Sequence, residues 1–194
     1  YLLTQVNKGI DGLPTITSMI KIEGNGSTIA RDSSAPDFRI LDIGESGDLT
    51  LTFVIITGGK AYNAGGIKNR GILKIDNSTI TNNQSEHQGG GIENVRGLAR
   101  INNSFVSNNS SSYGAGIYTW EGSTTLTNTQ VLGNLATIRG GGVDNNIGTL
   151  LLINSVIGDS EGSTSDCNNN FDGTVILEGS SVIKDGSCNV NNDA

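Results

Sequence analysis

Apolar and polar residues alternate along most of the chain. In residues 73–77 and 15–29 the apolar side chains fall two positions apart, as in a strand that buries one face. The β-branched stretch 78–81 is typical of a second strand, and the glycine-led stretch 89–94 of a third, short one. No 3.6-residue periodicity of the kind that marks helices is visible, so the pattern predicts an all-β chain.

This pattern returns about every 25 residues in three series that share one register. The glycine series is Gly47, Gly71, Gly97, Gly122, Gly148 and Gly173. The two aliphatic series are Leu51, Ile75, Ile101, Leu126, Leu152, Leu177 and Ile56, Ile80, Val106, Val131, Ile157, Val182. Each steps by 24, 26, 25, 26 and 25 residues. Units this short bury a face only by stacking, with each strand paired to its copy roughly 4.8 Å away. We therefore predict a single-stranded right-handed parallel β-helix of about seven turns, with three short strands per turn.

The same spacing organises the whole chain. No linker is visible, so residues 1–194 are expected to form one domain, with N-terminal turns in 1–46, regular repeats in 47–172 and a last rung and cap in 173–194. A fourth series marks the end of one strand in each unit. It consists of Asn77, Asn103, Asn128 and Asn154. We expect these side chains to point inward and to stack as an amide ladder along the axis.

Composition narrows the function classes. Charged residues make up 16% of the chain and the net charge is -7, which argues against a nucleic-acid partner. The longest apolar runs, such as 53–56 and 150–153, are too short for a transmembrane segment. The chain begins with Tyr1 and shows no signal peptide, so we expect a mature or excised fragment.

The two cysteines, Cys167 and Cys188, lie 21 residues apart near the C-terminus. One disulfide, and hence an oxidising compartment, is the favoured interpretation, and two buried free thiols are the alternative. A zinc site is not expected, because no further Cys and no nearby His completes a ligand set.

Three stretches carry a resemblance to a known group. These are "GNGSTIARDSSAPDFRILDI", "LTLTFVIITGG" and the repeated "GGGIEN" and "INNSFVSNN". They resemble secreted bacterial and archaeal proteins of the pectate-lyase-like right-handed β-helix class, in particular large cell-surface proteins with C-terminal anchor domains. The elements at 114–117 and 105–108 are also similar to chlamydial polymorphic membrane protein repeats. The resemblance spans residues 13–189 and implies a surface location with an adhesive or structural role.

One outward column of the predicted sheet carries candidate chemistry. Lys68, Glu93, Tyr118 and Asp144 follow the glycines at equivalent positions of successive turns. Glu93 and Asp144 are two turns apart, about 9.6 Å on the spacing between strands, which suits the two carboxylates of an inverting glycosidase. The next outward column holds Arg70, Val95 or Arg96, Trp120 and Asn146. Together the columns suggest a groove with an aromatic platform for a sugar.

Three interpretations of these columns stay open. Glu93 and Asp144 are candidate catalytic residues of a polysaccharide lyase or glycoside hydrolase. Lys68, Glu93, Tyr118, Trp120 and Asp144 are equally candidate residues of a non-catalytic carbohydrate or protein site. The third interpretation is a solvated outer face of mixed charge.

Two other motifs have simpler explanations. His87, the one histidine, stands beside Glu86 in a variable loop, and we expect an exposed side chain rather than a general base. No repeat supplies the aspartates of a calcium-binding array, so we expect no metal and no cofactor. The sequence thus predicts a secreted or cell-surface structural or adhesive module, in which open end strands favour self-association. A polysaccharide-active enzyme is the alternative function.

Overall fold

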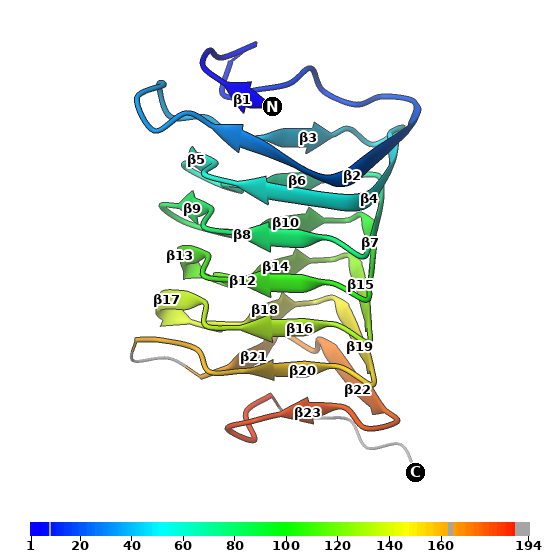
Figure 1. Ribbon diagram of the computed structural model, residues 1–194. Helices are drawn as coiled ribbons and strands as arrows, with labels where there is room; N and C mark the ends of the chain where they lie inside the picture. The colour runs from blue at the N-terminus through cyan, green and yellow to red at the C-terminus, as the bar shows by residue number, and fades with distance from the viewer. Residues whose placement is uncertain (8, 163–164, 189–194) are drawn as a thin grey trace.

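The protein is a parallel β-solenoid of about seven turns with about 26 residues per turn (Figure 1). The computed structural model describes residues 1–7, 9–162 and 165–188. All strand pairs in it are parallel, and strands within a sheet pair with their equivalents one turn before and one turn after, as the periodic series predicts. The predicted all-β solenoid is therefore confirmed.

Three sheets run along the solenoid axis. The largest has 13 strands and bends around a corner, because most turns contribute two strands to it. Its first side contains β4 (Asp48–Thr57), β7 (Ile72–Asp76), β11 (Leu98–Asn102), β15 (Ser123–Thr127), β19 (Thr149–Ile153) and β22 (Thr174–Glu178). Its second side contains β8 (Thr79–Thr81), β12 (Phe105–Ser107), β16 (Gln130–Leu132), β20 (Val156–Gly158) and β23 (Val182–Ile183). The long strands β2 (Met19–Arg31) and β4 pass round the corner, and β1 (Leu2–Leu3) pairs with β2.

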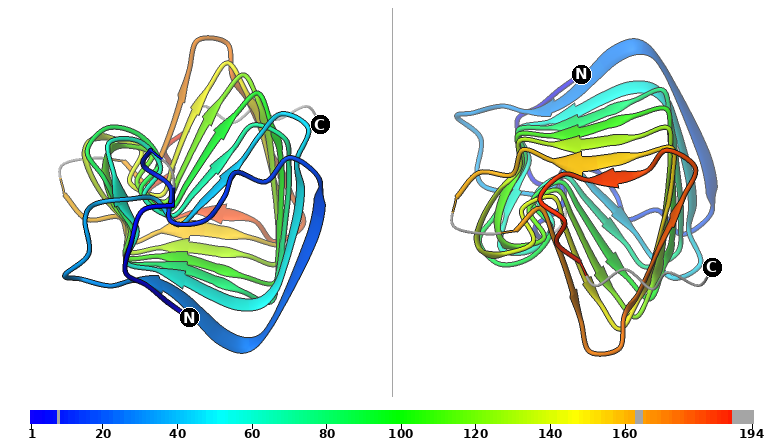
Figure 2. Two further views of the ribbon diagram at one scale, coloured as in Figure 1. Left: turned by 90° about the horizontal axis from the view of Figure 1, so that it is seen from above. Right: turned by 90° about the horizontal axis from the view of Figure 1, so that it is seen from below.

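The second sheet has six strands, and the third has four. The second comprises β3 (Leu41–Ile43), β6 (Ile67–Asn69), β10 (Ile92–Val95), β14 (Ile117–Trp120), β18 (Val143–Asn146) and β21 (Cys167–Asn170). The third comprises β5 (Lys60–Ala61), β9 (Gln84–Ser85), β13 (Ser110–Tyr113) and β17 (Leu135–Arg139). These four lie in the segments expected to be variable loops, and Figure 2 shows them as a lobe at one corner of the stack.

The aliphatic series form the core. The first series pairs without a break from Leu51 to Leu177. The second series pairs as predicted from Ile56 to Ile157. Its last predicted member is wrong, because Ile157 pairs with Ile183 and not with Val182. Six residues separate Leu177 from Ile183, whereas five separate the two series in every earlier unit, so Ile183 is 8% exposed and Val182 is 48% exposed.

Our prediction gives the positions of the four corner asparagines along the chain correctly, but it gives the direction of their side chains wrongly. Asn77, Asn103, Asn128 and Asn154 are exposed and have positive φ angles of 48°, 50°, 49° and 50°. Asparagine tolerates this left-handed conformation better than other residues with a Cβ, which explains its recurrence at the corner. They are therefore corner residues on the surface and not an interior ladder.

Interior polar ladders exist, but other residues form them. Each corner asparagine is followed by a buried hydroxyl that accepts a hydrogen bond from the backbone of the preceding turn, as in Ser78 N to Ser104 Oγ at 3.0 Å. A second ladder consists of the fully buried Asn83, Asn109 and Asn134. Asn109 Nδ2 donates to Asn134 Oδ1 at 3.0 Å and to the carbonyl of Ile80 at 3.0 Å. These ladders satisfy the backbone at corners where the sheet hydrogen bonds are interrupted.

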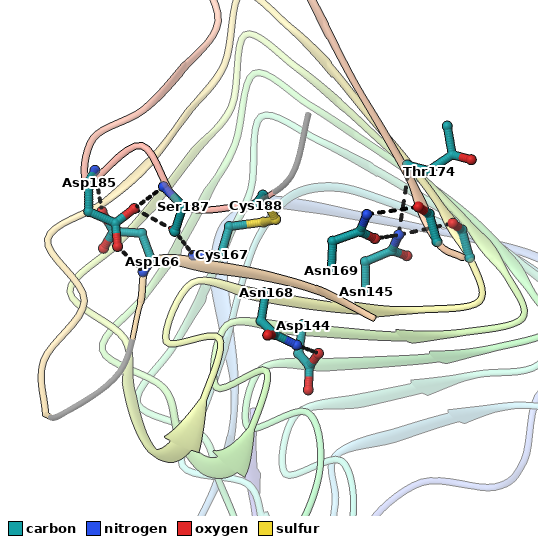
Figure 3. The surroundings of a disulfide bond; sticks show 12 residues. Asp144, Asn145, Asp166, Cys167, Asn168, Asn169, Thr174, Asp185, Ser187 and Cys188 are labelled. Atoms are coloured by element: carbon teal, nitrogen blue, oxygen red, sulfur yellow. Dashed lines mark hydrogen bonds between the residues drawn. A yellow bond between two sulfur atoms is a disulfide. The ribbon is translucent and has the colours of Figure 1, made fainter. Parts of the chain in front are cut away.

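A disulfide between Cys167 and Cys188 ties the C-terminal segment to the core, as predicted (Figure 3). Cys167 pairs with Val143 and so occupies the next position of the aliphatic column Ile67, Ile92, Ile117, Val143. Around it, Asp166 N donates to Asp185 Oδ2 at 2.8 Å, and Cys167 N donates to Ser187 Oγ at 2.9 Å. The Cα atoms of the two cysteines are 5.1 Å apart, within the usual range.

Candidate functional site

The predicted site column has the predicted register. Glu93 in β10 lies directly between Lys68 in β6 and Tyr118 in β14, and Tyr118 lies beside Asp144 in β18. The alignment follows from the solenoid, because strands of one sheet repeat the same position in each turn. Trp120 lies two residues after Tyr118, at the exposed end of β14.

The column is not a solvated outer face. Glu93 is 2% exposed, Tyr118 1% and Asp144 0%. The loop of each turn crosses over them at a glycine with positive φ, namely Gly89, Gly114 or Gly140. A Cβ on these glycines would lie 2.8 Å from Glu93 Cβ, 2.9 Å from Tyr118 Cβ and 2.8 Å from Asp144 Cβ, respectively. The segment that joins the third sheet to the second therefore turns back closely against the column, and the glycines allow this approach.

Lys68 and Glu93 form an ion pair with 3.0 Å between Nζ and Oε2. The Lys68 side chain is 18% exposed, whereas that of Glu93 is only 3% exposed. Oε2 of Glu93 accepts no hydrogen bond of good geometry from the residues described, so the Lys68 ammonium is the group that balances its charge.

Tyr118 presents a neutral hydroxyl. Burial, together with the negative charge of Asp144, raises the pKa of Tyr118 to about 12. A hydrogen bond with Gln88 from the covering loop opposes this shift. The phenol is therefore protonated at neutral pH and able to donate.

Asp144 is enclosed by protein partners. Its Oδ2 accepts from Arg139 Nε at 2.9 Å, and its Oδ1 accepts from Asn168 Nδ2 at 2.7 Å and from Asn146 Nδ2 at 3.0 Å. Burial raises the pKa of Asp144, and the hydrogen bond from Arg139 is the largest effect that opposes the rise. With its oxygens occupied and no exposed surface, Asp144 is a structural anchor, and the structure does not bring it into one open site with Glu93.

A groove of about 320 Å³ opens beside Glu93. Its lining residues are Lys68, Gln88, Glu93, Val95, Arg96, Tyr118 and Trp120. Four of the five predicted ligand-binding residues thus line one groove, and Asp144 is the exception. A neighbouring hollow shares Val95 and Arg96 with it and extends the groove toward Arg70 and Glu45.

Glu121 fixes the open rim of this groove. Its carboxylate accepts a hydrogen bond from Arg96 Nε at 2.6 Å and another from the Trp120 side chain, and these two bonds lower the pKa of Glu121. Trp120 is 37% exposed, so part of the indole is available to a ligand. Sequence reasoning missed Glu121 and Gln88, because neither belongs to a recurring series.

His87 is not an isolated loop residue. Its ring stacks on Tyr62 with centroids 5.6 Å apart and meets the edge of Tyr113 at 5.2 Å. The Arg139 guanidinium lies 4.9 Å from the Tyr113 ring centroid and continues the stack. These four residues recur at spacings of 25, 26 and 26, a signal that the sequence contained. The stack connects the loops of successive turns, so His87 has a structural role.

Among the described residues, no group of three or more His, Cys, Asp or Glu side chains is arranged to hold a metal ion. In the same part of the chain, no helix has the length and hydropathy required to cross a membrane. No family model, curated protein or solved structure matches this chain.

Proposed function

We propose that this protein is an extracellular adhesive module in which a rigid β-solenoid presents the groove beside Trp120 to a glycan and does not cleave it. An extracellular location is compatible with the disulfide between Cys167 and Cys188.

The groove itself carries the proposal. Lys68, Glu93 and the pair Tyr118 and Trp120 come from three successive turns and are held in register by the sheet. Recognition sites for small ligands combine apolar or aromatic walls with a few fixed polar groups, and this groove has both. Because the ion pair, the Tyr118 hydroxyl and the Glu121 hydrogen bonds fix the groups beforehand, little side-chain entropy is lost on binding.

The arrangement of the carboxylates favours binding over hydrolysis. Acid–base hydrolysis of a glycosidic bond requires two carboxyl groups that flank the bond. Glu93 lines the groove, whereas Asp144 is enclosed by its protein partners. The Glu121 carboxylate at the rim is occupied by Arg96 and Trp120. The groove therefore supports binding better than it supports a glycoside hydrolase.

The test uses immobilised and soluble glycans with the full chain. We expect binding to at least one glycan class, loss of that binding in Trp120→Ala, and no new reducing or unsaturated ends in long incubations. Arg100→Gln, an exposed change on β11, is the matched control and should bind normally. If products form and Glu93→Gln abolishes their formation, the protein is an enzyme and this proposal is wrong. Absence of binding to any glycan would also reject the proposal.

Self-association is a second candidate role, favoured by one observation. Large apolar side chains are exposed in the last turns, namely Ile147, Phe171, Ile176 and Val182. Lateral contact between copies would cover such side chains. Light scattering at increasing protein concentration tests this role, with Ile176→Ser expected to weaken association and a monomer at all concentrations excluding it.

A further inference from the structure

The charge balance of the groove indicates the kind of glycan. Its two cationic side chains are each matched by a carboxylate, since Lys68 lies 3.0 Å from Glu93 and Arg96 lies 2.6 Å from Glu121. The adjoining Arg70 is matched in the same way by Asp42 at 2.8 Å. A site for an acidic sugar needs an unmatched cation to replace the water lost from the carboxylate. Among the residues that line this groove, none supplies one.

The floor of the groove favours a hydroxyl over a carboxylate. Glu93 Oε2 is buried and lacks a hydrogen bond of good geometry. This oxygen has almost no solvent contact and stays paired with Lys68, so a sugar hydroxyl in the groove lies over the Glu93 carboxylate and, being neutral, is not repelled by it. A uronic acid carboxylate at the same place has no proton to donate near neutral pH and would face a like charge. The neighbouring Tyr118, whose pKa is about 12, remains a donor to a sugar oxygen.

The rim adds an apolar surface of fixed orientation. Trp120 is partly exposed, and the Glu121 carboxylate is the partner of its indole N–H. The remaining ring surface suits the C–H face of a pyranose, which is apolar although its edges carry hydroxyls. The groove volume of about 320 Å³ is at the small end for ligand sites, so it accommodates a short part of a chain.

From these three features we infer that the groove binds neutral pyranose units and discriminates against uronic acids. The inference rests on the proposed glycan-binding function and specifies its ligand class. The same balance predicts that binding depends little on salt, because no net charge on the protein is neutralised when the ligand enters.

The single tryptophan provides a direct test. Trp120 is the one Trp of the chain and lies in the groove, so its fluorescence reports occupancy without a label. Neutral oligosaccharides built from glucose, mannose, xylose or galactose are titrated against oligogalacturonate and glucuronate-containing oligomers, at low and at high NaCl. We expect at least one neutral series to bind at least about tenfold more tightly than any uronate, with a dissociation constant that changes less than about threefold with salt.

Charge variants make the result specific to the groove. Glu121→Gln leaves Arg96 without its partner, and because the pair lies at the surface the fold should survive. This change should shift the preference toward uronates by about tenfold and make their binding salt-sensitive. Glu93→Gln should do the same through Lys68, while Arg100→Gln should leave both ligand classes unchanged.

The possible failures are distinguishable. Tight, salt-sensitive binding of a uronate by the unaltered protein would overturn the inference and leave the glycan-binding function standing. An unchanged preference in both Glu121→Gln and Glu93→Gln, with folding verified by circular dichroism, would also overturn it. No response to either class of sugar would reject the proposed function itself.

Discussion

Asn109 Oδ1 accepts two hydrogen bonds from one residue of the preceding turn, from Asn83 N at 3.0 Å and from Asn83 Nδ2 at 3.1 Å. One amide oxygen thus accepts the backbone hydrogen bond that the sheet does not provide at this corner. It also satisfies a buried side-chain amide. Asn134 repeats the arrangement for Asn109 at 3.0 Å and 3.0 Å. The interior of the solenoid is therefore held by specific polar contacts as well as by aliphatic packing.

Replacing Asn109 with Ala should destabilise the protein strongly. The change leaves the Asn83 N–H and the Ile80 carbonyl buried without their partners, and each orphaned group costs about 1–3 kcal/mol. We expect the free energy of unfolding, measured by urea denaturation, to fall by about 3–5 kcal/mol. Asn103→Gly, at an exposed corner with φ of 50°, is the control and should cost less than about 1 kcal/mol. Equal losses in both variants would contradict the structural role given to the ladder.

Alkaline pH should destabilise the fold through Tyr118. Its folded pKa of about 12 exceeds the ordinary value of 10.0, so the unfolded chain loses this proton first as the pH rises. The stabilising contribution is complete below pH 10 and is lost between about pH 10 and 12, with a total of about 2–3 kcal/mol. In Tyr118→Phe, the 295 nm absorbance should lack the component that titrates near pH 12, and the loss of stability over that range should be smaller. Identical titrations of both proteins would show that Tyr118 is not buried as described.

Removing the disulfide should loosen the C-terminal end. Cys188→Ser opens a covalent loop with a sequence separation of 21 residues, for which chain entropy predicts a loss of about 3 kcal/mol. Hydrogen exchange should increase first in β21 and β23, while β10 and β14 stay protected because they lie turns away. Uniform loss of protection would instead mean that the solenoid unfolds as one unit.

The covering loop depends on glycine at the crossing points. In Gly89→Ala the new methyl group would lie 2.8 Å from Glu93 Cβ and 2.7 Å from the Ile92 carbonyl oxygen, so the loop must move away. We expect Trp120 fluorescence to change and the protein to lose about 2–4 kcal/mol of stability. Gly26→Ala is the matched control, since Gly26 also has positive φ but nothing lies within 4 Å of an added Cβ. That variant should show only the backbone cost of about 1 kcal/mol and no fluorescence change.

Acid should weaken the cap around Asp185. Burial alone would raise the pKa of Asp185, but hydrogen bonds from Ser187 and from the backbone of Asp166 outweigh burial and hold it below the ordinary value of 3.8. Its contribution is therefore present above about pH 3.8 and is lost as the pH falls through the lower folded value. Amide resonances of Asp166 and Ser187 should shift together in that acid range, and Asp185→Asn should remove the shift. An unchanged titration in the variant would assign the effect to another carboxyl group.

The repeat made most of the core predictable. Leu51, Ile75 and Ile101 share a register because each turn must present the same side chain to the interior. The error at Val182 arose where an extra residue entered the last unit, a change in length that spacing alone does not locate. The direction of the corner asparagine side chains was predicted wrongly. Asparagine recurs both where the backbone is left-handed and where a buried side chain forms hydrogen bonds, and the sequence alone does not distinguish the two.

The site was predictable in register but not in exposure. Glu93 was aligned correctly with Lys68 and Tyr118, yet its burial depends on where the loop of the same turn returns. Loops of different sequence leave little periodic signal, although the recurrence of Gly89, Gly114 and Gly140 marks the crossing points. The hydrogen bonds of Glu121 involve neighbours on two turns, and a single sequence provides no series that would reveal them.

Cys167 both continues an aliphatic column and holds the tail through its sulfur. Pairing of β21 with β18 places its thiol opposite Cys188, so the wound last turns hold the two sulfur atoms together and favour the cross-link. By linkage, the bond in turn stabilises the wound end of the solenoid against opening. The ease with which a reductant opens one pair of sulfur atoms therefore reports how firmly the last turns are wound.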